Sequence, residues 1–387
     1  MSPVCQVTVH TPVHDSFRVR QVIGMFDLPV RASWSETFAA EVPSLDEPWS
    51  IGCIIGPSGS GKSTLARAAF GDAVYQAQPW PANLAVIDSL GNAPIQQITQ
   101  TLTAVGLGSP PAWLKPFSVL SNGEKFRCEL ARALLQTAAA DHANSLVVFD
   151  EFTSLVDRTV AKVASAAIAK AIRSQRLKCR FVAVSCHADI APWLEPDWML
   201  DLGAVSASGN ASGPVLSRGC LRRPRLQLQV IRCPQRLWSL FARHHYLSGG
   251  LSKAATCYAA WLDGRPIAFC ALLAILGQRT HKRISRIVTL PDYQGLGIGL
   301  RLAERVADDA RSKGFRVSIT ASHPAVIGAC RRSTNWHLVS YKPLGNRSRQ
   351  HYAARDIPSS AGRGVATFEY FRPFQEQVQH EASSSSQ

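Results

Sequence analysis

The sequence has no run of about 18 apolar residues, the length that a membrane-spanning helix needs. It also shows no N-terminal pattern of a secretory signal peptide. Its ten cysteines form no Cys-x-x-Cys pair and no regular framework spacing, which argues against a disulfide scaffold and a zinc site. We therefore expect a cytoplasmic protein with reduced, buried thiols and no membrane span of its own.

Acidic residues are scarce in the second half of the chain. Residues 1–214 carry 16 Lys and Arg against 18 Asp and Glu, whereas residues 215–387 carry 26 against 9, and 22 of those 26 are Arg. The formal net charge of +15 therefore comes from the second half. Such a concentration of positive charge favours phosphate-bearing partners, so nucleic acid is the partner we expect first. A solvated basic surface and an acidic protein partner are the alternatives. The densest basic runs are Arg218–Arg225, His281–Arg283 and Gly345–Tyr352.

A chain of 387 residues is long enough for two domains. The segment Gly203–Pro214 is small, polar and glycine-rich, so it is either a linker or a surface hairpin at the end of the first domain. The last residues are mostly serine, which predicts disorder. We accordingly divide the chain into residues 1–214, residues 215–375 and a disordered tail, 376–387.

The segment Gly56–Thr64 fits the pattern G-x-x-x-x-G-K-[ST] at every required position. It follows the apolar run Ile51–Ile55, which predicts a buried strand, and precedes a helical pattern from Leu65. Glycines let such a loop curl so that its N–H groups point at phosphate oxygens. We expect Lys62 to reach the β- and γ-phosphates and Ser63 to ligate Mg²⁺. The residues of this phosphate loop that we predict to bind ATP are Gly56, Ser58, Gly59, Gly61, Lys62, Ser63 and Thr64.

Three later segments specify the kind of nucleotide site. The apolar strand Leu146–Phe149 ends in Asp150, expected to hold Mg²⁺ through water, and Glu151, expected to orient or deprotonate the attacking water. Before it, Leu120–Lys125 reads Leu-Ser-Asn-Gly-Glu-Lys and opens a helix. After it, another apolar strand ends at His187.

The order of these segments resembles the ABC ATPase family. The resemblance implies that Ser121 and Gly123 contact the γ-phosphate bound by the opposite protomer, and that His187 senses that phosphate. It also implies that Ser154–Asp157 crosses the dimer interface, so ATP should bring two chains together. Asn122 departs from the commonest Leu-Ser-Gly-Gly-Gln form. Two family parts stay open: Gln78 is the candidate for the glutamine near Mg²⁺, and either Phe17 or Phe26 is the candidate for the aromatic that stacks on adenine.

A second glycine loop lies in the basic half. The segment Arg286–Gly299 is again strand, loop and helix start, and its loop reads Gln-Gly-Leu-Gly-Ile-Gly. It resembles motif A of the GNAT acyltransferases, which implies binding of the CoA pyrophosphate at a helix N-terminus. A dinucleotide fingerprint is the main alternative, but its glycines are spaced differently. The residues predicted to bind acyl-CoA are Val288, Gln294, Gly295, Leu296, Gly297, Ile298 and Gly299.

The flanking patterns support this resemblance. Two apolar runs, Thr256–Leu262 and Ile267–Leu276, are joined by Asp-Gly-Arg-Pro, a strong hairpin signal. We expect further strands at Val317–Thr320, His337–Tyr341 and Val365–Tyr370. The expected fold class is therefore α/β, with a P-loop ABC ATPase domain followed by a mixed-sheet GNAT acyltransferase domain.

The residues that would catalyse acyl transfer are less clearly marked in the sequence. The GNAT family often uses a tyrosine after the motif A helix, but the sequence there does not reproduce its context, so no tyrosine is transferred. The cluster Arg243–Ser248 lies on the expected acceptor side, where His245 could act as base and Tyr246 as acid. The alternative is an aromatic plug at a helix end. Asp292 could also assist, although it suits a turn.

These features predict an ATP-hydrolysing dimer with acyl-CoA-dependent N-acyltransferase activity, acting on nucleic acid with no membrane involved. The expected cofactors are ATP, Mg²⁺ and acetyl-CoA or another acyl-CoA. The basic second domain is similar to the phage Mom-like group, whose GNAT folds modify DNA bases, and this would require base flipping in a duplex. Two alternatives remain: an ATP-regulated acetyltransferase of a small amine or protein, and an ABC-type DNA clamp with a non-catalytic GNAT fold.

Overall fold

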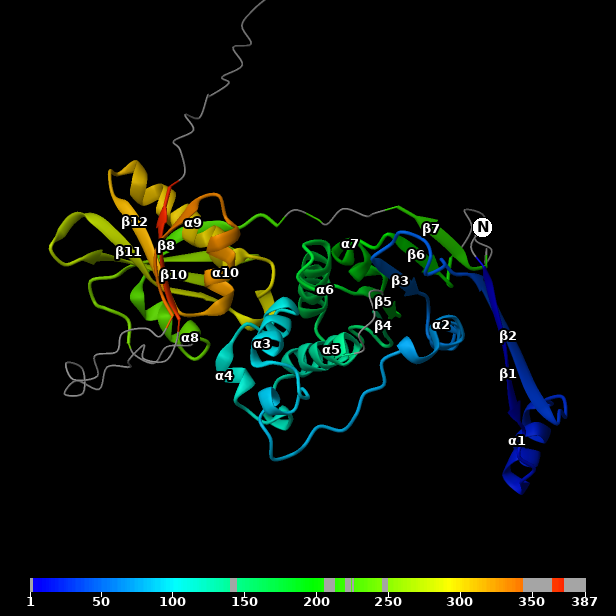
Figure 1. Cartoon of the computed structure of the whole chain (residues 1–387). Coiled ribbons are helices and arrows are strands. Elements are labelled where there is room, and N and C mark those ends of the chain that lie inside the picture. The colour runs from blue at the N-terminus through cyan, green and yellow to red at the C-terminus, as the bar shows by residue number, and fades with distance from the viewer. Residues whose placement is uncertain are drawn as a thin grey trace, which may run out of the picture. The chain divides into compact units, whose positions relative to one another are not determined.

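The computed structural model describes residues 3–139, 145–204, 213–219, 224, 226–245, 250–343 and 364–371 (Figure 1). It divides into two compact units. The first unit comprises Met1–Leu226 with Pro291–Leu296, and the second comprises Gln227–Leu290 with Gly297–Gln387. The expected boundary after residue 214 stays a prediction. Tyr246, the basic run Gly345–Tyr352 and the expected tail lie outside the described residues.

The first unit is built on a five-stranded sheet with the strand order β4-β5-β3-β6-β7. The first four of these strands are parallel, and β7 pairs antiparallel with β6. Every residue of β3 is buried, as expected for a parallel strand covered on both faces. The strands are β3 (Ile51–Ile55), β4 (Leu146–Phe149), β5 (Arg180–Ser185), β6 (Trp198–Asp201) and β7 (Val215–Arg218).

Helices pack against this sheet, and the hydrophobic core of the unit consists of side chains from both the strands and the helices. Helix α6 is rich in alanine and has eleven buried residues, so it can pack closely. Its N-terminus is capped by Asp157, whose carboxylate accepts from the amide of Thr159 at 2.8 Å. The helices of this unit after its first ribbon are α2 (Lys62–Phe70), α3 (Ile95–Ala104), α4 (Pro110–Trp113), α5 (Asn122–Ala139), α6 (Arg158–Arg173) and α7 (Ala191–Leu194).

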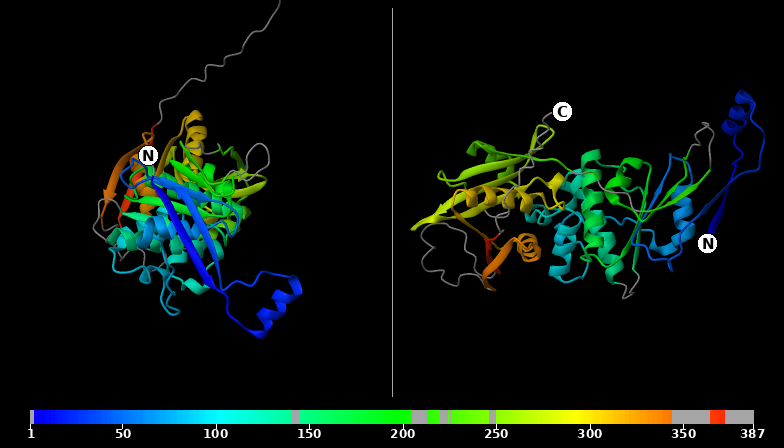
Figure 2. Two further views of the ribbon diagram at one scale, coloured as in Figure 1. Left: turned by 90° about the vertical axis from the view of Figure 1, so that its right-hand side faces the viewer. Right: turned by 90° about the horizontal axis from the view of Figure 1, so that it is seen from above.

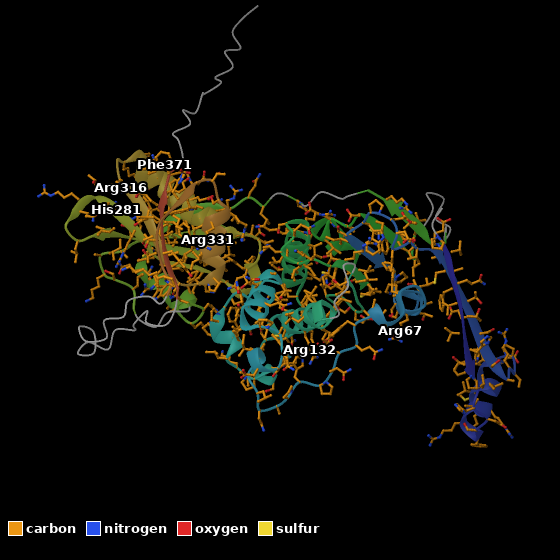
Figure 3. All side chains as sticks on the ribbon, viewed as in Figure 1. Arg67, Arg132, His281, Arg316, Arg331 and Phe371 are labelled. Atoms are coloured by element: carbon orange, nitrogen blue, oxygen red, sulfur yellow. The ribbon has the colours of Figure 1, made fainter. Side chains whose placement is uncertain are left out.

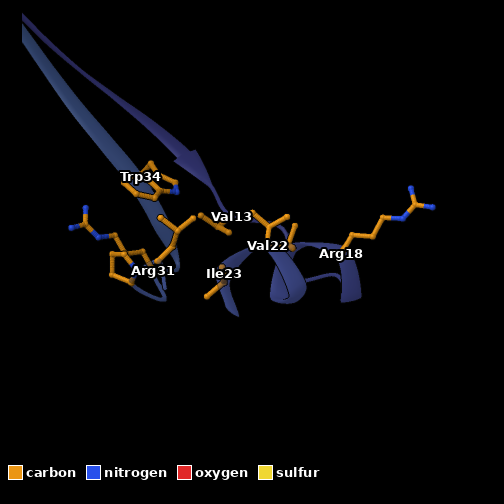
Figure 4. Close-up of a pocket in the computed structure, with 9 residues that line it drawn as sticks. Val13, Arg18, Val22, Ile23, Arg31 and Trp34 are labelled. Carbon is orange, nitrogen blue, oxygen red and sulfur yellow. The ribbon is translucent and has the colours of Figure 1, made fainter. Parts of the chain in front are cut away.

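The chain begins with a two-stranded antiparallel ribbon that carries a helix at its end. Strands β1 (Val4–Pro12) and β2 (Ser33–Glu41) run side by side, and α1 (Phe17–Phe26) lies between them in sequence (Figures 1 and 2). None of the α1 residues is buried. Next to α1 is an apolar cavity of about 300 Å³, from which Arg18 and Arg31 point away (Figure 4).

The second unit contains a seven-stranded sheet with the order β13-β14-β12-β11-β10-β9-β8. Strands β11 and β12 are parallel, and the other neighbours are antiparallel. The expected fold class, a P-loop α/β domain followed by a mixed-sheet domain, is confirmed. The strands are β8 (Gln229–Cys233), β9 (Thr256–Leu262), β10 (Arg265–Ile275), β11 (Gln278–Thr289), β12 (Arg316–Ala321), β13 (Trp336–Lys342) and β14 (Val365–Tyr370). The helices are α8 (Trp238–Ala242), α9 (Ile298–Ser312) and α10 (Pro324–Arg332).

Candidate functional sites

The phosphate loop connects β3 to α2, as its sequence predicted. Gly59 and Gly61 both have φ of +81°, a conformation that other residues adopt only with strain. A Cβ on Gly61 would also lie 2.2 Å from Cδ1 of Phe38, which belongs to β2. The Lys62 side chain is buried and folds back over the loop, where its Nζ donates to the carbonyl of Pro57 at 2.6 Å. The ammonium group therefore lies against the backbone that is expected to hold phosphate.

Ser63 and Asp150 come together from distant parts of the sequence. The Ser63 hydroxyl donates to Oδ1 of Asp150 at 3.0 Å. Nη2 of Arg67 lies 4.0 Å from Oδ2 of the same carboxylate. A hydroxyl and a carboxylate are hard oxygen donors of the type that Mg²⁺ takes, so these two residues fit the predicted metal.

Glu151 and His187 follow neighbouring parallel strands, β4 and β5. The carboxyl ends of these strands lie at the same sheet edge as the end of β3, where the phosphate loop begins. Glu151 has φ of +51°, and its Oε2 accepts from the Ser154 hydroxyl at 2.6 Å. The backbone N–H of His187 donates to Oγ of Ser185 at 3.1 Å. The fold thus brings the predicted catalytic pair and the phosphate loop to one edge of the sheet.

Ser121 and Gly123 lie at the start of α5. The Ser121 hydroxyl donates to Oε2 of Glu124 at 2.8 Å, and the Ser121 amide donates to the same oxygen at 2.9 Å. The Glu124 amide in turn donates to Oγ of Ser121 at 3.4 Å, which completes a capping box. A Cβ on Gly123 would lie 3.2 Å from Cγ1 of Val160. Ser121 is exposed, and its hydroxyl bonds within this cap.

The residues predicted near the adenine ring and near Mg²⁺ are at exposed positions. The Gln78 carbonyl accepts from Nη2 of Arg132 at 2.5 Å, while its side chain is exposed. The side chains of Phe17 and Phe26 are 76% and 67% exposed at the end of the first ribbon. Phe38 is an aromatic residue of the described chain whose ring lies against Gly61 of the phosphate loop, and it was not among the predicted residues. Most residues of β2 are exposed, so the sequence of this strand has no apolar alternation that would indicate a packed residue at Phe38.

The second glycine loop lies between β11 and α9. Gly295 and Gly297 have φ of +90° and +87°, and Gly297 is the N-cap of α9. Gly299 is in the first turn, where a Cβ would lie 3.0 Å from Oγ1 of Thr289 at the end of β11. The missing side chain lets the strand end and the helix start approach each other. This arrangement leaves the N–H groups of the first helical turn available to an anion.

The ladder between β11 and β12 ends before β11 does. Residues His281–Ile284 of β11 pair with Arg316–Ile319 of β12. Strand β11, however, stays paired with β10 as far as Thr289. Among the described residues, no β12 partner continues the ladder beyond Ile284, so one edge of β11 is open there. Val288 lies in this stretch, and its side chain is 5% exposed. A ligand at this edge can therefore contact the backbone of Val288 more readily than its buried side chain.

His245 is buried against the aromatic cluster of the second unit. Its ring centroid is 5.6 Å from that of Trp238 at an interplanar angle of 67°. Trp238, Phe269 and Val288 belong to the same apolar cluster. The predicted base thus packs against the cluster that contains Val288, a predicted CoA-binding residue. The predicted acid, Tyr246, lies outside the described residues.

Basic and polar side chains line part of the second unit's sheet. His281 bridges Oε1 of Gln278 at 2.7 Å and Oγ of Ser318 at 3.0 Å. Arg316 pairs with Glu369 at 2.7 Å, and this hydrogen bond holds the pKa of the Glu369 carboxyl below its usual value. Figure 3 labels His281 and Arg316 on this unit. In the described parts of the chain, no helix has the length and apolar character needed to cross a membrane.

Comparison with known proteins supports this reading of the second unit. Residues 226–332 match the acetyltransferase (GNAT) family, which confirms the expected GNAT resemblance. No curated protein matches the chain.

Similar solved structures include both acetyltransferases and ATP-binding cassettes. The IAA acetyltransferase from Bacillus cereus ATCC 14579 is 17% identical, with 37% of this chain and 99% of that chain covered and a TM-score of 0.28. The ribosomal-protein-S18-alanine N-acetyltransferase from Escherichia coli is 13% identical, with 39% and 99% covered and a TM-score of 0.30. The ATP-binding cassette MJ0796, as a post-hydrolysis dimer bound to ADP and Pi, is 15% identical, with 48% and 90% covered and a TM-score of 0.34. These are partial similarities.

Proposed function

We propose that the chain is an ATPase that couples nucleotide hydrolysis to acyl-CoA-dependent N-acylation of nucleic acid. The observation that carries the proposal is the pair of strand–glycine loop–helix units, β3 to α2 and β11 to α9. In each, glycines with positive φ precede a helix whose first N–H groups can bind phosphate oxygens. One loop suits the phosphates of ATP and the other suits the pyrophosphate of CoA.

In the ATPase half, five residues share four tasks. Lys62 would neutralise charge on the β- and γ-phosphates, and Ser63 with Asp150 would hold Mg²⁺, which would offset the charge that develops during phosphoryl transfer. Glu151 orients the attacking water and accepts its proton as the new O–P bond forms, while the bond between the γ-phosphorus and the bridging oxygen breaks and ADP leaves. His187 contacts the γ-phosphate from the neighbouring strand end. The Ser63–Asp150 hydrogen bond supports this assignment.

ATP should also assemble two chains. Ser121 lies exposed at the start of α5, fixed by its cap to Glu124. The resemblance to ABC ATPases makes it a ligand for the γ-phosphate bound by the opposite protomer. We therefore propose an ATP-dependent homodimer in which each site is completed by the partner.

In the acyltransferase half, the acceptor amine attacks the thioester carbonyl. A C–N bond forms, the C–S bond breaks, and the amine's proton passes to His245. The thiolate leaving group takes a proton from an acid, for which Tyr246 is the candidate. The open edge of β11 supplies backbone groups that orient the acyl-CoA. Nucleic acid is proposed as the acceptor because positive charge is concentrated in residues 215–387.

The test is the ATPase rate and duplex-DNA binding of the purified protein at two salt concentrations, with and without acetyl-CoA. We expect salt-sensitive DNA binding that stimulates ATP hydrolysis, and an acyl mass increment on the DNA by mass spectrometry. Acetyl-CoA binding without any effect of DNA would instead favour a small amine or protein acceptor. DNA-stimulated hydrolysis without CoA binding would favour a DNA clamp with a non-catalytic second half.

A further inference from the structure

A β-bulge in β11 places two arginines on one face of the second unit's sheet. Arg283 is opposite Leu273 and Arg286 is opposite Ala271, with a register shift between them. Leu273 and Ala271 are two residues apart on β10, so they face the same side. In a regular strand, residues three apart point to opposite faces; the extra residue, Ser285, brings both arginines to one face.

The two arginines line an open cavity of about 330 Å³ on this face. Arg286 is oriented by backbone carbonyls: its Nη1 donates to the carbonyl of Ser285 at 2.8 Å and its Nη2 to that of Gly250 at 3.2 Å. Arg283 is exposed. The lining residues in the described part of the chain are Gly250, Leu251, Ser252, Leu273, Arg283, Ser285 and Arg286, and none of them is acidic.

This combination of side chains suits a phosphate group. Arg283 offers a forked set of donors that matches the oxygens of a phosphodiester, and Arg286, which two backbone carbonyls hold in place, adds a second positive charge on the same face. Ser252 and Ser285 also line the cavity, and the Ser285 hydroxyl donates to the Ala271 carbonyl at 3.3 Å. Leu251 and Leu273 add apolar surface to the lining of the cavity.

The cavity also has a defined place relative to the predicted CoA strand. Arg286 and Val288 lie on the same face of β11, opposite Ala271 and Phe269. Two residues along a strand correspond to about 7 Å. A phosphate held by Arg286 would therefore lie about one side-chain spacing along β11 from Val288, the residue expected to contact the acyl-CoA.

We propose that Arg283 and Arg286 form a phosphate subsite that holds a backbone phosphodiester of the nucleic-acid acceptor. This rests on the proposed function, since it names the contact by which that acceptor is positioned. The bulge at Ser285 is the feature that creates the subsite, because it alone brings the two arginines together.

The first experiment measures duplex-DNA affinity of the full chain against salt concentration. Arg283→Ala should lower the slope of log K against log salt by about one, as expected for one lost phosphate contact. Arg279→Ala is the matched control, because Arg279 is exposed on the same strand but does not line the cavity. Equal losses in both variants would overturn the subsite. The double variant Arg283→Ala/Arg286→Ala should lower the slope by about one in total, because both arginines serve one phosphate; a total loss of about two would overturn the shared subsite.

The second experiment identifies what occupies the cavity. Phenylglyoxal modification of Arg283 and Arg279 is quantified by peptide mass spectrometry with a short DNA duplex, inorganic phosphate or acetyl-CoA present. We expect the duplex and phosphate to protect Arg283 and not Arg279. Protection by acetyl-CoA alone would assign the subsite to the cofactor and overturn the proposal. Duplex binding without protection of Arg283 would overturn the subsite and leave the proposed function intact, whereas phosphate protection in a protein that binds no duplex would contradict the nucleic-acid acceptor itself.

Discussion

The hydroxyl of Ser154 donates a hydrogen bond to the carboxylate of Glu151 across 2.6 Å. The two residues belong to one tight turn, in which the Ser154 amide also donates to the Glu151 carbonyl at 3.1 Å. The turn holds Glu151 at a positive φ, and the hydroxyl then fixes the direction of its carboxylate. Ser154 is therefore a positioning residue for the predicted catalytic base.

Replacing Ser154 with alanine should slow ATP hydrolysis by about 10- to 100-fold, because a hydrogen bond to a charged group contributes about 1.5–3 kcal/mol. We expect kcat to fall while KM for ATP changes little, since Ser154 acts on the carboxylate and not on the nucleotide. Ser154→Thr keeps the hydroxyl and should restore most of the rate. An unchanged kcat in the alanine variant would show that Glu151 is oriented by other groups.

The phosphate loop offers a matched pair of glycine substitutions. Gly59 and Gly61 share φ of +81°, but a Cβ on Gly59 would meet nothing within 4 Å, whereas one on Gly61 would collide with Phe38. Gly59→Ala should cost only backbone strain, about 1–2 kcal/mol. Gly61→Ala should lower the melting temperature further and abolish ATP binding. Adding Phe38→Ala should recover part of the lost stability; full additivity of the two changes would contradict the contact.

The local parts of both loops were predictable because a glycine pattern between an apolar strand and a helix is written in consecutive residues. The contact of Phe38 with Gly61 was not, because it depends on how the first ribbon packs. The strands of that ribbon are mostly exposed, so they lack the apolar alternation that marks a strand in sequence. The bulge at Ser285 was also hidden, since strand register is set by tertiary pairing. The approach of Ser63 to Asp150, by contrast, agrees with the sequence, because both residues were predicted to hold the same Mg²⁺.

The glycine at the start of α9 can be tested against the glycine that follows its end. Gly297 and Gly314 have φ of +87° and +81°, so a glutamate carries a similar backbone penalty at either position. Gly297→Glu also puts a negative charge where CoA pyrophosphate is expected, so acetyl-CoA binding by calorimetry should be lost while ATP hydrolysis remains measurable. Gly314→Glu should bind acetyl-CoA nearly normally. Unchanged affinity in Gly297→Glu would show that this loop does not bind CoA.

Glu151→Gln should trap the ATP-bound dimer, because the amide keeps the shape of the side chain but cannot accept the proton from water. Light scattering with ATP and Mg²⁺ should give twice the monomer mass, and the dimer should disappear without nucleotide. Lys62→Ala in the same background is the control, since it removes the phosphate contact and should stay monomeric. A monomer in the Glu151→Gln variant with bound ATP would contradict the ABC-type dimer.

Cys186 gives a chemical probe of the same turn. Its Sγ lies 4.0 Å from Oγ of Ser154, and the thiol is exposed, while burial raises the pKa of Cys53 to about 12 and that of Cys128 to about 12. Because the thiolate is the reactive form, a maleimide at neutral pH should label Cys186 well before the two buried thiols. The adduct would crowd the Ser154–Glu151 pair, so labelling and loss of ATPase activity should follow the same time course by mass spectrometry and phosphate release. Cys186→Ser should remain active and resist inhibition. Inhibition of that variant at the wild-type rate would place the sensitive thiol elsewhere in the chain.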